Sequence, residues 1–327
     1  MATFYTHQAE NRRNSLLLML SVAVVLAVLG FVIGFAVSGG VDGALLAIVG
    51  ALALSLVLSL GSYYAGDSLV LAASQAHELA EGQAPELLNI VRELSIAGDL
   101  PMPRVYLIDD TAPNAFATGR DPAHASIAVT SGLLQKLDRE ELQGVIGHEL
   151  SHVGNLDIRF ALLVGVLVGS IALLADLFLR YTWISGSMGG RSRSRDERGG
   201  GGGLQALMFV LALVLAILAP IFARLVQLAV SRQREYLADA SSVALTRNPA
   251  GLERALAKIA GDTEVLEAAN RATQHLYLVN PIKKFEERAK GLFSTHPPII
   301  ERIDRLRALH GAPPLAGGSA VALTGLE

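Results

Sequence analysis

The chain has 327 residues, of which 51% are hydrophobic and 17% are charged. An average soluble domain has about 25% charged residues, so this composition indicates a membrane protein. The formal net charge of −3 and the lack of a basic domain argue against nucleic acid as a main partner. The sequence has no cysteine, which excludes disulfides, thiolate zinc sites and a cysteine nucleophile.

A transmembrane hairpin is the first predicted element, and it covers residues 15–64. Ser15–Val37 and Ala44–Tyr64 are apolar runs, each long enough to cross a hydrocarbon core of about 30 Å. The first run is longer than the roughly 7–15 apolar residues of a cleaved signal peptide, so we expect an uncleaved anchor. Arginines close the N-terminal tail, residues 1–14. The positive-inside rule therefore places the tail, and the chain that follows the second span, in the cytoplasm.

Residues 65–157 show helical and strand patterns in turn. Apolar residues occur at helical spacing from Asp67 to Leu100, and we interpret His77–Glu81 within this stretch as an exposed helix face. Asp138 and Glu141 have the spacing of a capping box, which predicts the start of a second helix. Between the two helices, three short runs bounded by turn residues predict a small sheet: Arg104–Ile108, Ala115–Thr118 and Ser126–Thr130.

Two histidines four residues apart follow in the second predicted helix, in the run His148-Glu149-Leu150-Ser151-His152. Residues four apart share one helix face, so both imidazoles can bind a single zinc ion at roughly 2.0–2.1 Å. Glu149 can reach a water molecule in an open coordination position. This is the H-E-x-x-H pattern of metallopeptidases, and it predicts one Zn²⁺ per chain with Glu149 as the base.

A second apolar hairpin is predicted over residues 158–230. Phe160–Leu179 and Leu204–Val230 are its apolar segments, and an arginine- and glycine-rich loop, residues 180–203, separates them. Together with the first hairpin, the simplest arrangement has four spanning helices. If both segments cross, however, the arginines of the loop lie outside, against the positive-inside rule. Either the first hairpin determines the orientation or the second is only partly inserted, and the sequence leaves both open.

Residues 231–310 contain a candidate for the third metal ligand. A catalytic zinc ion needs three protein ligands and one open position. Glu235 and Asp239 are four residues apart in a predicted helix, so Glu235 can complete the ligand set while Asp239 accepts the second ring N–H of a ligating histidine. Taken alone, this pair would be a salt-bridged helix face, but the upstream motif favours a metal site. Residues 311–327 are rich in Pro, Gly and Ala and are predicted to be disordered.

Three separated motifs together resemble one known family. They are His148–His152, Arg234–Asp239 and Ser294–Pro298. In this order they closely resemble the HtpX-type membrane metalloproteases, which are bacterial relatives of the CAAX prenyl proteases in the gluzincin group. The resemblance extends over nearly the whole chain, from the first apolar hairpin to about Leu309.

The resemblance implies a role for each of several residues. Asn114 and the strand after it would bind the substrate backbone by strand addition. His296 would lie near the developing oxyanion, and Arg302 would support that region. The implied metal ligands are His148, His152 and Glu235, and Asp239 is the partner of a ligand. The implied general base is Glu149, with His296 as the oxyanion residue. The implied substrate-binding residues are Asn114, Ala115, Phe116 and Arg302.

The sequence therefore predicts a mainly α membrane protein with an α+β zincin-like protease domain and a small sheet beside the zinc helix. We expect a zinc-dependent endopeptidase, multi-pass in the bacterial inner membrane with its active site facing the cytoplasm. Its partners would be the lipid bilayer and polypeptide substrates, namely membrane or misfolded proteins in quality control and the stress response. Two alternatives are a processing protease of the prenyl-peptide type and a non-catalytic zinc-stabilised membrane scaffold. The intact Glu149 argues against the scaffold, because structural zinc sites tend to have four closed ligands.

Overall fold

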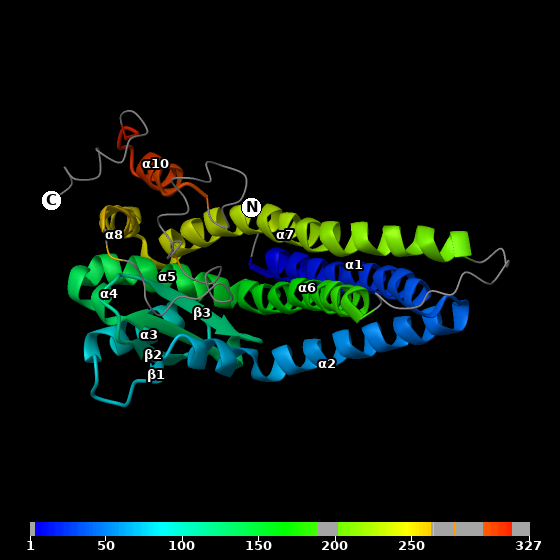
Figure 1. Cartoon of the computed structure of the whole chain (residues 1–327). Coiled ribbons are helices and arrows are strands. Elements are labelled where there is room, and N and C mark those ends of the chain that lie inside the picture. The colour runs from blue at the N-terminus through cyan, green and yellow to red at the C-terminus, as the bar shows by residue number, and fades with distance from the viewer. Residues whose placement is uncertain (1–3, 189–201, 263, 265–277, 279–296, 316–327) are drawn as a thin grey trace. The chain divides into compact units, whose positions relative to one another are not determined.

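The computed structural model describes residues 4–188, 202–262, 264, 278 and 297–315, and Figure 1 shows their helices and strands. The chain divides into two compact units. We call them the helical unit (Arg13–Tyr63 and Leu163–Gln227) and the sheet unit (Met1–Arg12, Tyr64–Leu162 and Leu228–Glu327).

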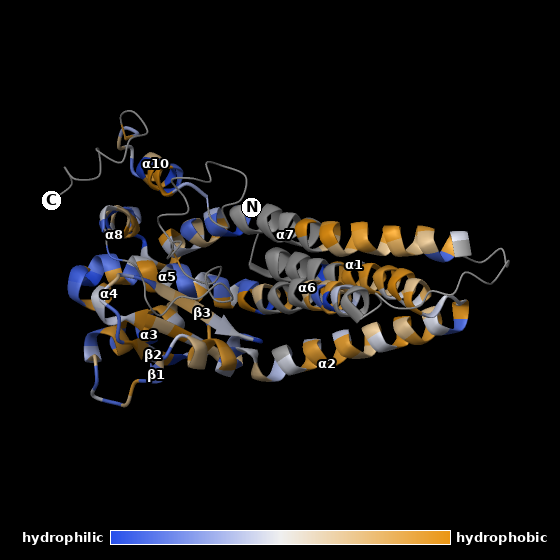
Figure 2. Cartoon of the chain, viewed as in Figure 1, coloured by the Kyte–Doolittle hydropathy of each residue, from blue (hydrophilic) through white to orange (hydrophobic). Residues whose placement is uncertain are grey.

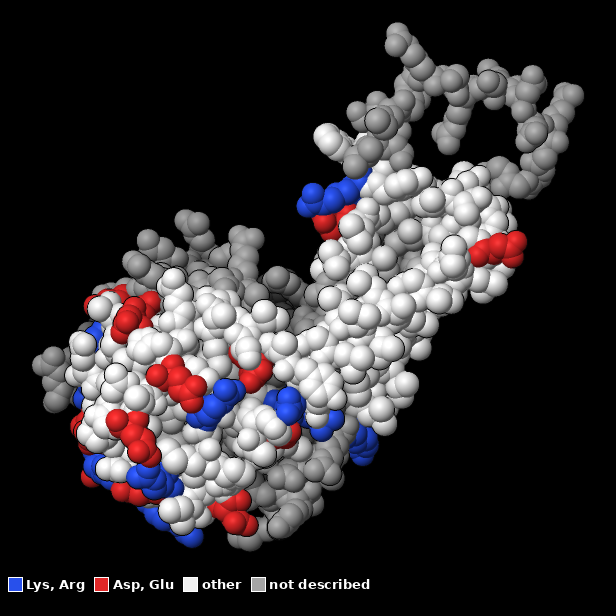
Figure 3. All heavy atoms as spheres, turned by 90° about the horizontal axis from the view of Figure 1, so that it is seen from below, with Lys and Arg blue, Asp and Glu red and all other residues white. Residues whose placement is uncertain are grey.

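Parts of four long helices build the helical unit: α1 (Phe4–Ser38), α2 (Val41–Ala73), α6 (Asp157–Met188) and α7 (Gly202–Thr246). Large apolar side chains remain exposed on it, including Leu46 at 75% and Val57 at 66%. These helices are mostly hydrophobic along their described length in Figure 2, and few charged side chains lie on them in Figure 3. Such a surface suits contact with lipid. Buried apolar side chains join α1, α6 and α7: Val32, Ala36, Ala175, Phe178, Ala212 and Ala216.

Within its described residues, this unit has two stretches that are long and apolar enough to cross a membrane. They are Met19–Ser38 in α1 and Val41–Gly61 in α2, and a shorter apolar stretch, Gly203–Ala219, lies in α7. α1 and α2 approach closely at Gly34, where an added Cβ atom would lie 2.5 Å from the Ala47 Cβ atom. Small residues at such contacts are typical of packed membrane helices. The first two apolar helices are confirmed, whereas four spanning helices stay a prediction.

A four-stranded mixed sheet lies in the sheet unit, in the order β1-β2-β4-β3. β2 pairs parallel with β4, with Val105 opposite Ile127, while β3 pairs antiparallel with β4, with Ala117 opposite the same Ile127. β3 is therefore an edge strand. The three predicted strands are confirmed as β2 (Arg104–Ile108), β3 (Ala115–Gly119) and β4 (Ala125–Thr130), and a short 3₁₀ helix, Pro122–His124, joins the last two.

The fourth strand corrects the prediction of an exposed helix face over His77–Glu81. β1 (His77–Glu78) pairs antiparallel with β2, with His77 opposite Leu107. Gln75 and Ala84 have φ angles of 52° and 44°, which interrupt a right-handed helix on both sides of β1. The apolar spacing therefore continues across a segment whose backbone is not helical.

Five shorter helices lie in the part of the sheet unit that the structure describes: α3 (Pro85–Ala97), α4 (Ser131–Lys136), α5 (Arg139–Gly154), α8 (Pro249–Gly261) and α10 (Ile299–Leu309). The capping box at the start of α5 is confirmed. The Glu141 N–H donates to Asp138 Oδ1, and the Asp138 N–H donates to Glu141 Oε2, both at 2.9 Å. The unit has one main core, which includes Leu87, Ile90, Ile127, Val145, Ile146, Leu150, Leu252, Leu256 and Ile303.

α5 approaches its neighbours very closely at two glycines. An added Cβ atom on Gly144 would lie 2.7 Å from Leu252 Cα in α8, and one on Gly147 would lie 2.8 Å from Ser242 Oγ in α7. The Ser242 hydroxyl also donates to the Gly144 carbonyl at 2.7 Å. These contacts fix α5 against α7 and α8.

We expect Gly144→Ala to destabilise the protein, although alanine is the better helix former by about 1 kcal/mol. The added methyl group would overlap the α8 backbone, and overpacking of this kind costs about 1–3 kcal/mol. Thermal unfolding of detergent-solubilised protein, followed by circular dichroism, measures the change. Gly261→Ala is the matched control, because a Cβ atom there meets nothing within 4 Å. Equal stability of the two variants would contradict the close packing.

Candidate metal centre

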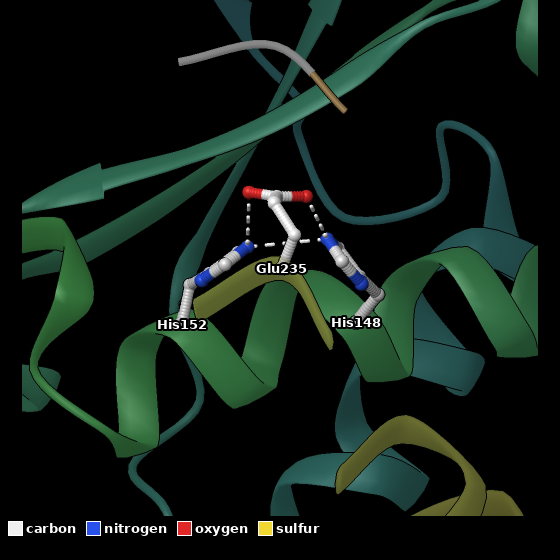
Figure 4. A group of neighbouring side chains, drawn as sticks. All are labelled: His148, His152 and Glu235. Atoms are coloured by element: carbon white, nitrogen blue, oxygen red, sulfur yellow. Dashed lines mark hydrogen bonds and ion pairs between the residues drawn. The ribbon is translucent and has the colours of Figure 1, made fainter. Parts of the chain in front are cut away.

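His148 and His152 lie one turn apart on α5 and direct their Nε2 atoms toward each other and toward Glu235, as Figure 4 shows. The two Nε2 atoms are 3.1 Å apart. Glu235 belongs to α7, and its Oε2 and Oε1 atoms lie 3.5 Å from His148 Nε2 and 3.6 Å from His152 Nε2. The structure therefore brings the three predicted ligands together as one group that could hold a metal ion.

The distances within this group fit a metal ion. Two ligand atoms of a tetrahedral zinc ion, each roughly 2.0–2.1 Å from it, lie about 3.4 Å apart. Two imidazoles and one carboxylate are also a donor set that leaves one coordination position open. The His148 side chain is 1% exposed, but that of His152 is 16% exposed, so the group is not fully closed to solvent.

A buried carboxylate orients the His148 ring through Nδ1, the ring nitrogen that is not directed toward Glu235. Asp239 Oδ1 lies 2.9 Å from His148 Nδ1. This pair assigns the Nδ1 proton to the bond with Asp239 and leaves the Nε2 lone pair for the metal side. Burial alone would lower the pKa of His148, but the hydrogen bonds to Asp239 and Glu235 raise it to about 9. A metal ion binds the neutral imidazole through Nε2. Metal binding must therefore displace the second proton, which the raised pKa keeps on the ring.

Arg302 lies behind Asp239 and is 1% exposed. Its Nε and Nη2 atoms donate to the two oxygens of Asp239 at 2.9 and 2.7 Å. Burial would raise the pKa of Asp239, but the guanidinium charge and these hydrogen bonds hold it below its ordinary value. Arg302 Nη1 lies 3.4 Å from Glu235 Oε2 and donates to the Leu278 carbonyl at 3.1 Å. One arginine thus contacts both a ligand and the partner of a ligand. The resemblance implied a place for Arg302 among the substrate-binding residues, and its contacts here are with buried groups of the protein.

His152 has a carboxylate partner that the sequence analysis missed. Asp157 Oδ2 lies 3.1 Å from His152 Nδ1, and Asp157 is the first residue of α6. Burial would lower the pKa of His152, but the hydrogen bond to Asp157 raises it above its ordinary value. The chain turns sharply between the two residues, at Leu156 with a φ angle of 64°. An acidic residue five positions after the second histidine, beyond such a break, is the signal that could have found this contact.

Glu149 is 1% exposed and lies against the edge strand. Its carboxylate accepts a hydrogen bond from the backbone N–H of Ala117 in β3. Burial raises the pKa of Glu149, while the neighbouring His148 and His152 and this hydrogen bond oppose the rise. The predicted base is therefore held by a hydrogen bond to β3, near the two histidines.

The predicted substrate-binding residues Asn114, Ala115 and Phe116 are buried at the start of β3. The Thr130 N–H donates to the Asn114 carbonyl at 3.0 Å, so alternate residues from Ala115 onward direct their backbone groups to the open edge. Two hydrogen bonds agree with this direction: the Leu278 N–H donates to the Ala115 carbonyl at 2.9 Å, and the Ala117 N–H donates to the Glu149 carboxylate. The Phe116 side chain is fully buried in a second core with Tyr106 and Ile108. At this edge the strand therefore presents backbone groups, and the Phe116 side chain is enclosed in the core.

Comparison with known proteins decides the family, because the sequence pattern of Peptidase family M48 matches residues 81–310. The chain belongs to peptidase family M48. A "Protease HtpX homolog" of Streptococcus uberis is 42% identical over 303 residues, which cover 93% of this chain and 99% of the relative. Another, of Syntrophobacter fumaroxidans, is 48% identical over 261 residues, or 79% of this chain and 88% of the relative. Among solved structures, S. mikatae Ste24p aligns with a TM-score of 0.48 and 18% identity over 78% of this chain and 57% of that chain.

The M48 match includes all the predicted site residues. Of these, His296 lies outside the described residues. The others lie around the histidine pair of α5 or on β3. The main residues that sequence reasoning missed in this M48 peptidase are Ala117 and Asp157, which contact Glu149 and His152.

We expect the purified M48 peptidase to bind one divalent metal ion per chain, and His148→Ala or Glu235→Ala to remove it. Loss of a residue that hydrogen-bonds to a metal ligand weakens metal binding by about 10- to 100-fold. Loss of a ligand itself should weaken metal binding by more than this. Plasma mass spectrometry of the metal content after dialysis measures this. His124→Ala is the control, because His124 is half exposed and contacts Asp121 away from the histidine pair. Equal metal content in all variants would exclude this group as the metal site.

Proposed function

We propose that this M48 peptidase is a membrane-anchored, zinc-dependent endopeptidase. One observation carries the proposal: His148, His152 and Glu235 come together as one group that could hold a metal ion, and the neighbouring Glu149 carboxylate accepts a hydrogen bond from the edge strand β3. A metal-binding group alone could be structural. A buried carboxylate beside it, bonded to an edge strand, supports catalysis on an extended peptide.

Zinc is the metal that suits the donor set best, since imidazole and carboxylate are its common ligands in peptidases. Bound there, it would supply Lewis-acid activation of water and of the scissile carbonyl. His148, His152 and Glu235 would hold it. Asp239 and Asp157 would keep each imidazole in the tautomer that presents Nε2.

Glu149 is proposed as the general base and then the general acid. It would accept a proton from the attacking water as the new C–O bond forms, and donate it to the leaving amine as the C–N bond breaks. The Ala117 N–H would orient the carboxylate, and burial, by raising its pKa, would favour proton acceptance. His296 is proposed, on the family resemblance, to stabilise the oxyanion.

The proposed substrates are extended polypeptide segments, in membrane or misfolded proteins. A peptide added to the open edge of β3 would bind through main-chain hydrogen bonds, which demand little of its side chains. This mode supports broad quality control more than the processing of one prenylated peptide. The presence of Glu149 beside a three-ligand group disfavours the non-catalytic scaffold.

We propose a multi-pass topology in a bacterial inner membrane, with the sheet unit in the cytoplasm. The two apolar stretches of α1 and α2 support the first hairpin. In this proposal α6 and α7 provide a third and a fourth span. The predicted loop 180–203 is thereby corrected at both ends, because α6 extends to Met188 and α7 begins at Gly202. The protease domain then has two parts, residues 65–157 and 231–310, separated by the second hairpin.

We expect Glu149→Gln to reduce cleavage of an unfolded protein such as casein by at least about 100-fold, because general acid–base catalysis contributes at least this much. Glutamine keeps the size of the side chain and an acceptor for Ala117, so metal content should stay at the wild-type level. Gel analysis of casein digestion and metal quantification test the two halves. Cleavage at the wild-type rate by the metal-loaded variant would overturn the proposed role of Glu149.

The absence of cysteine allows a direct test of topology with single introduced cysteines. In intact spheroplasts, we expect an impermeant maleimide to label Asp42→Cys in the first turn of α2 and Arg193→Cys between the end of α6 and the start of α7. Glu81→Cys, on the exposed surface of the sheet unit, should be labelled only after lysis. Labelling of Glu81→Cys from outside would contradict the cytoplasmic active site, and a protected Arg193→Cys would contradict four full spans.

A further inference from the structure

Two buried groups support His152 without belonging to the proposed ligand set. Asp157 Oδ2 lies 3.1 Å from His152 Nδ1, and Asp157 Oδ1 lies 3.1 Å from Arg234 Nη1. The Asp157 side chain is 6% exposed and that of Arg234 is 12% exposed. A single carboxylate therefore bridges a histidine and an arginine, away from bulk water.

Arg234 is itself fixed by an aromatic ring. Its guanidinium carbon lies 3.6 Å from the centroid of the Phe160 ring, which is close for a cation–π contact. Phe160 and Asp157 both belong to the first turn of α6, whereas Arg234 belongs to α7 and directly precedes Glu235. The arginine thus clamps the beginning of α6 to the part of α7 that carries Glu235.

The corresponding support of His148 is built from other elements. There, Asp239 is on α7 itself and Arg302 is on α10, with two hydrogen bonds between them. Each histidine therefore has a carboxylate partner, and each carboxylate has an arginine. Only the support of His152 depends on α6.

We propose that Asp157 and Arg234 are positioning residues for the metal centre, with Arg234 holding Asp157 so that His152 presents its Nε2 atom to the metal. The proposal rests on the metal centre of the proposed function. It follows that the first turn of α6 is a structural part of this centre. If the first turn of α6 moved away from α7, His152 would lose its partner Asp157, whereas His148 would keep its own partner Asp239.

The physical basis is the cost of burying a charge. Without Arg234, the buried Asp157 carboxylate loses the cationic partner that lies 3.1 Å from its Oδ1 atom, and removing one partner of a buried ion pair is strongly unfavourable. The carboxylate would reorient toward water, and the imidazole would lose the contact that selects its tautomer. Arg234→Met removes the charge but keeps an unbranched apolar side chain over Phe160, whereas Arg234→Lys keeps the charge.

The test uses full-length protein in detergent. Zinc affinity is measured by competition with a chromophoric chelator, and ligand geometry by the visible absorption spectrum of the Co²⁺-loaded protein. We expect Asp157→Ala to weaken zinc binding by about 10- to 100-fold, and Arg234→Met to weaken it less and to shift the Co²⁺ spectrum. Arg234→Lys should lie closer to wild type in both measurements.

A double variant separates positioning from general destabilisation. If Arg234 acts through Asp157, adding Arg234→Met to Asp157→Ala should weaken zinc binding no further. Arg305→Met is the matched control, because Arg305 also lies 3.6 Å over an aromatic ring, that of Tyr236 in α7, and pairs with Glu301 at 3.0 Å. Its zinc affinity and Co²⁺ spectrum should equal those of wild type.

Two results would overturn the proposal. One is wild-type zinc affinity and an unchanged Co²⁺ spectrum in Arg234→Met, whatever its thermal stability. The other is full additivity of the two substitutions. A wild-type protein that binds no zinc would overturn the proposed function itself, so the two failures can be told apart.

Discussion

The close approach of α7 to α5 is the constraint on which the whole site depends. Glu235, Asp239 and Ser242 recur on one face of α7, at the spacing of a helix stripe. Ser242 meets α5 at Gly144 and Gly147, where a side chain would not fit. Because metal–ligand distances vary by only about 0.2 Å, a slightly larger helix separation would place Glu235 out of reach. Two glycines therefore determine whether the histidines of α5 acquire a third ligand.

Electrostatic pairing makes this arrangement tolerable in a buried environment. The acidic side chains Glu149, Asp157, Glu235 and Asp239 all lie in the interior. Charges in such surroundings are costly unless they are paired and hydrogen-bonded. Arg302 pairs with Asp239 and contacts Glu235, Arg234 pairs with Asp157, and a backbone N–H serves Glu149. Each carboxylate thus has a partner in the protein besides the histidines.

Local patterns explain why much of this could be predicted from the sequence. The capping box at Asp138 and the strand runs depend on residues near one another in the chain, and the structure has them where expected. The spacing of His148 and His152 on one helix likewise requires only helical geometry. The need of a catalytic zinc ion for a third ligand, together with the spacing of Glu235 and Asp239 in a predicted helix, then linked Glu235 to them across the second hairpin.

What could not be predicted depends on contacts between distant segments. No sequence pattern near Arg234 indicates that it pairs with Asp157 in another helix rather than with the adjacent Glu235. The N–H of Ala117 has no sequence signal, because every residue except proline has such a donor. β1 was missed because two residues are too few to show an alternating pattern, and the positive φ angles that end the helix belong to Gln75 and Ala84 rather than to glycine.

The division of the ligand set between α5 and α7 has a consequence for biosynthesis. About 80 residues, including both segments of the second apolar hairpin, separate His152 from Glu235. At a synthesis rate of about 5–20 residues per second, the ribosome needs several seconds to make this stretch. During that interval the nascent chain has the histidine pair and Glu149 but lacks the third ligand. The order of the elements therefore means that the group of His148, His152 and Glu235 cannot form until the second hairpin has been made.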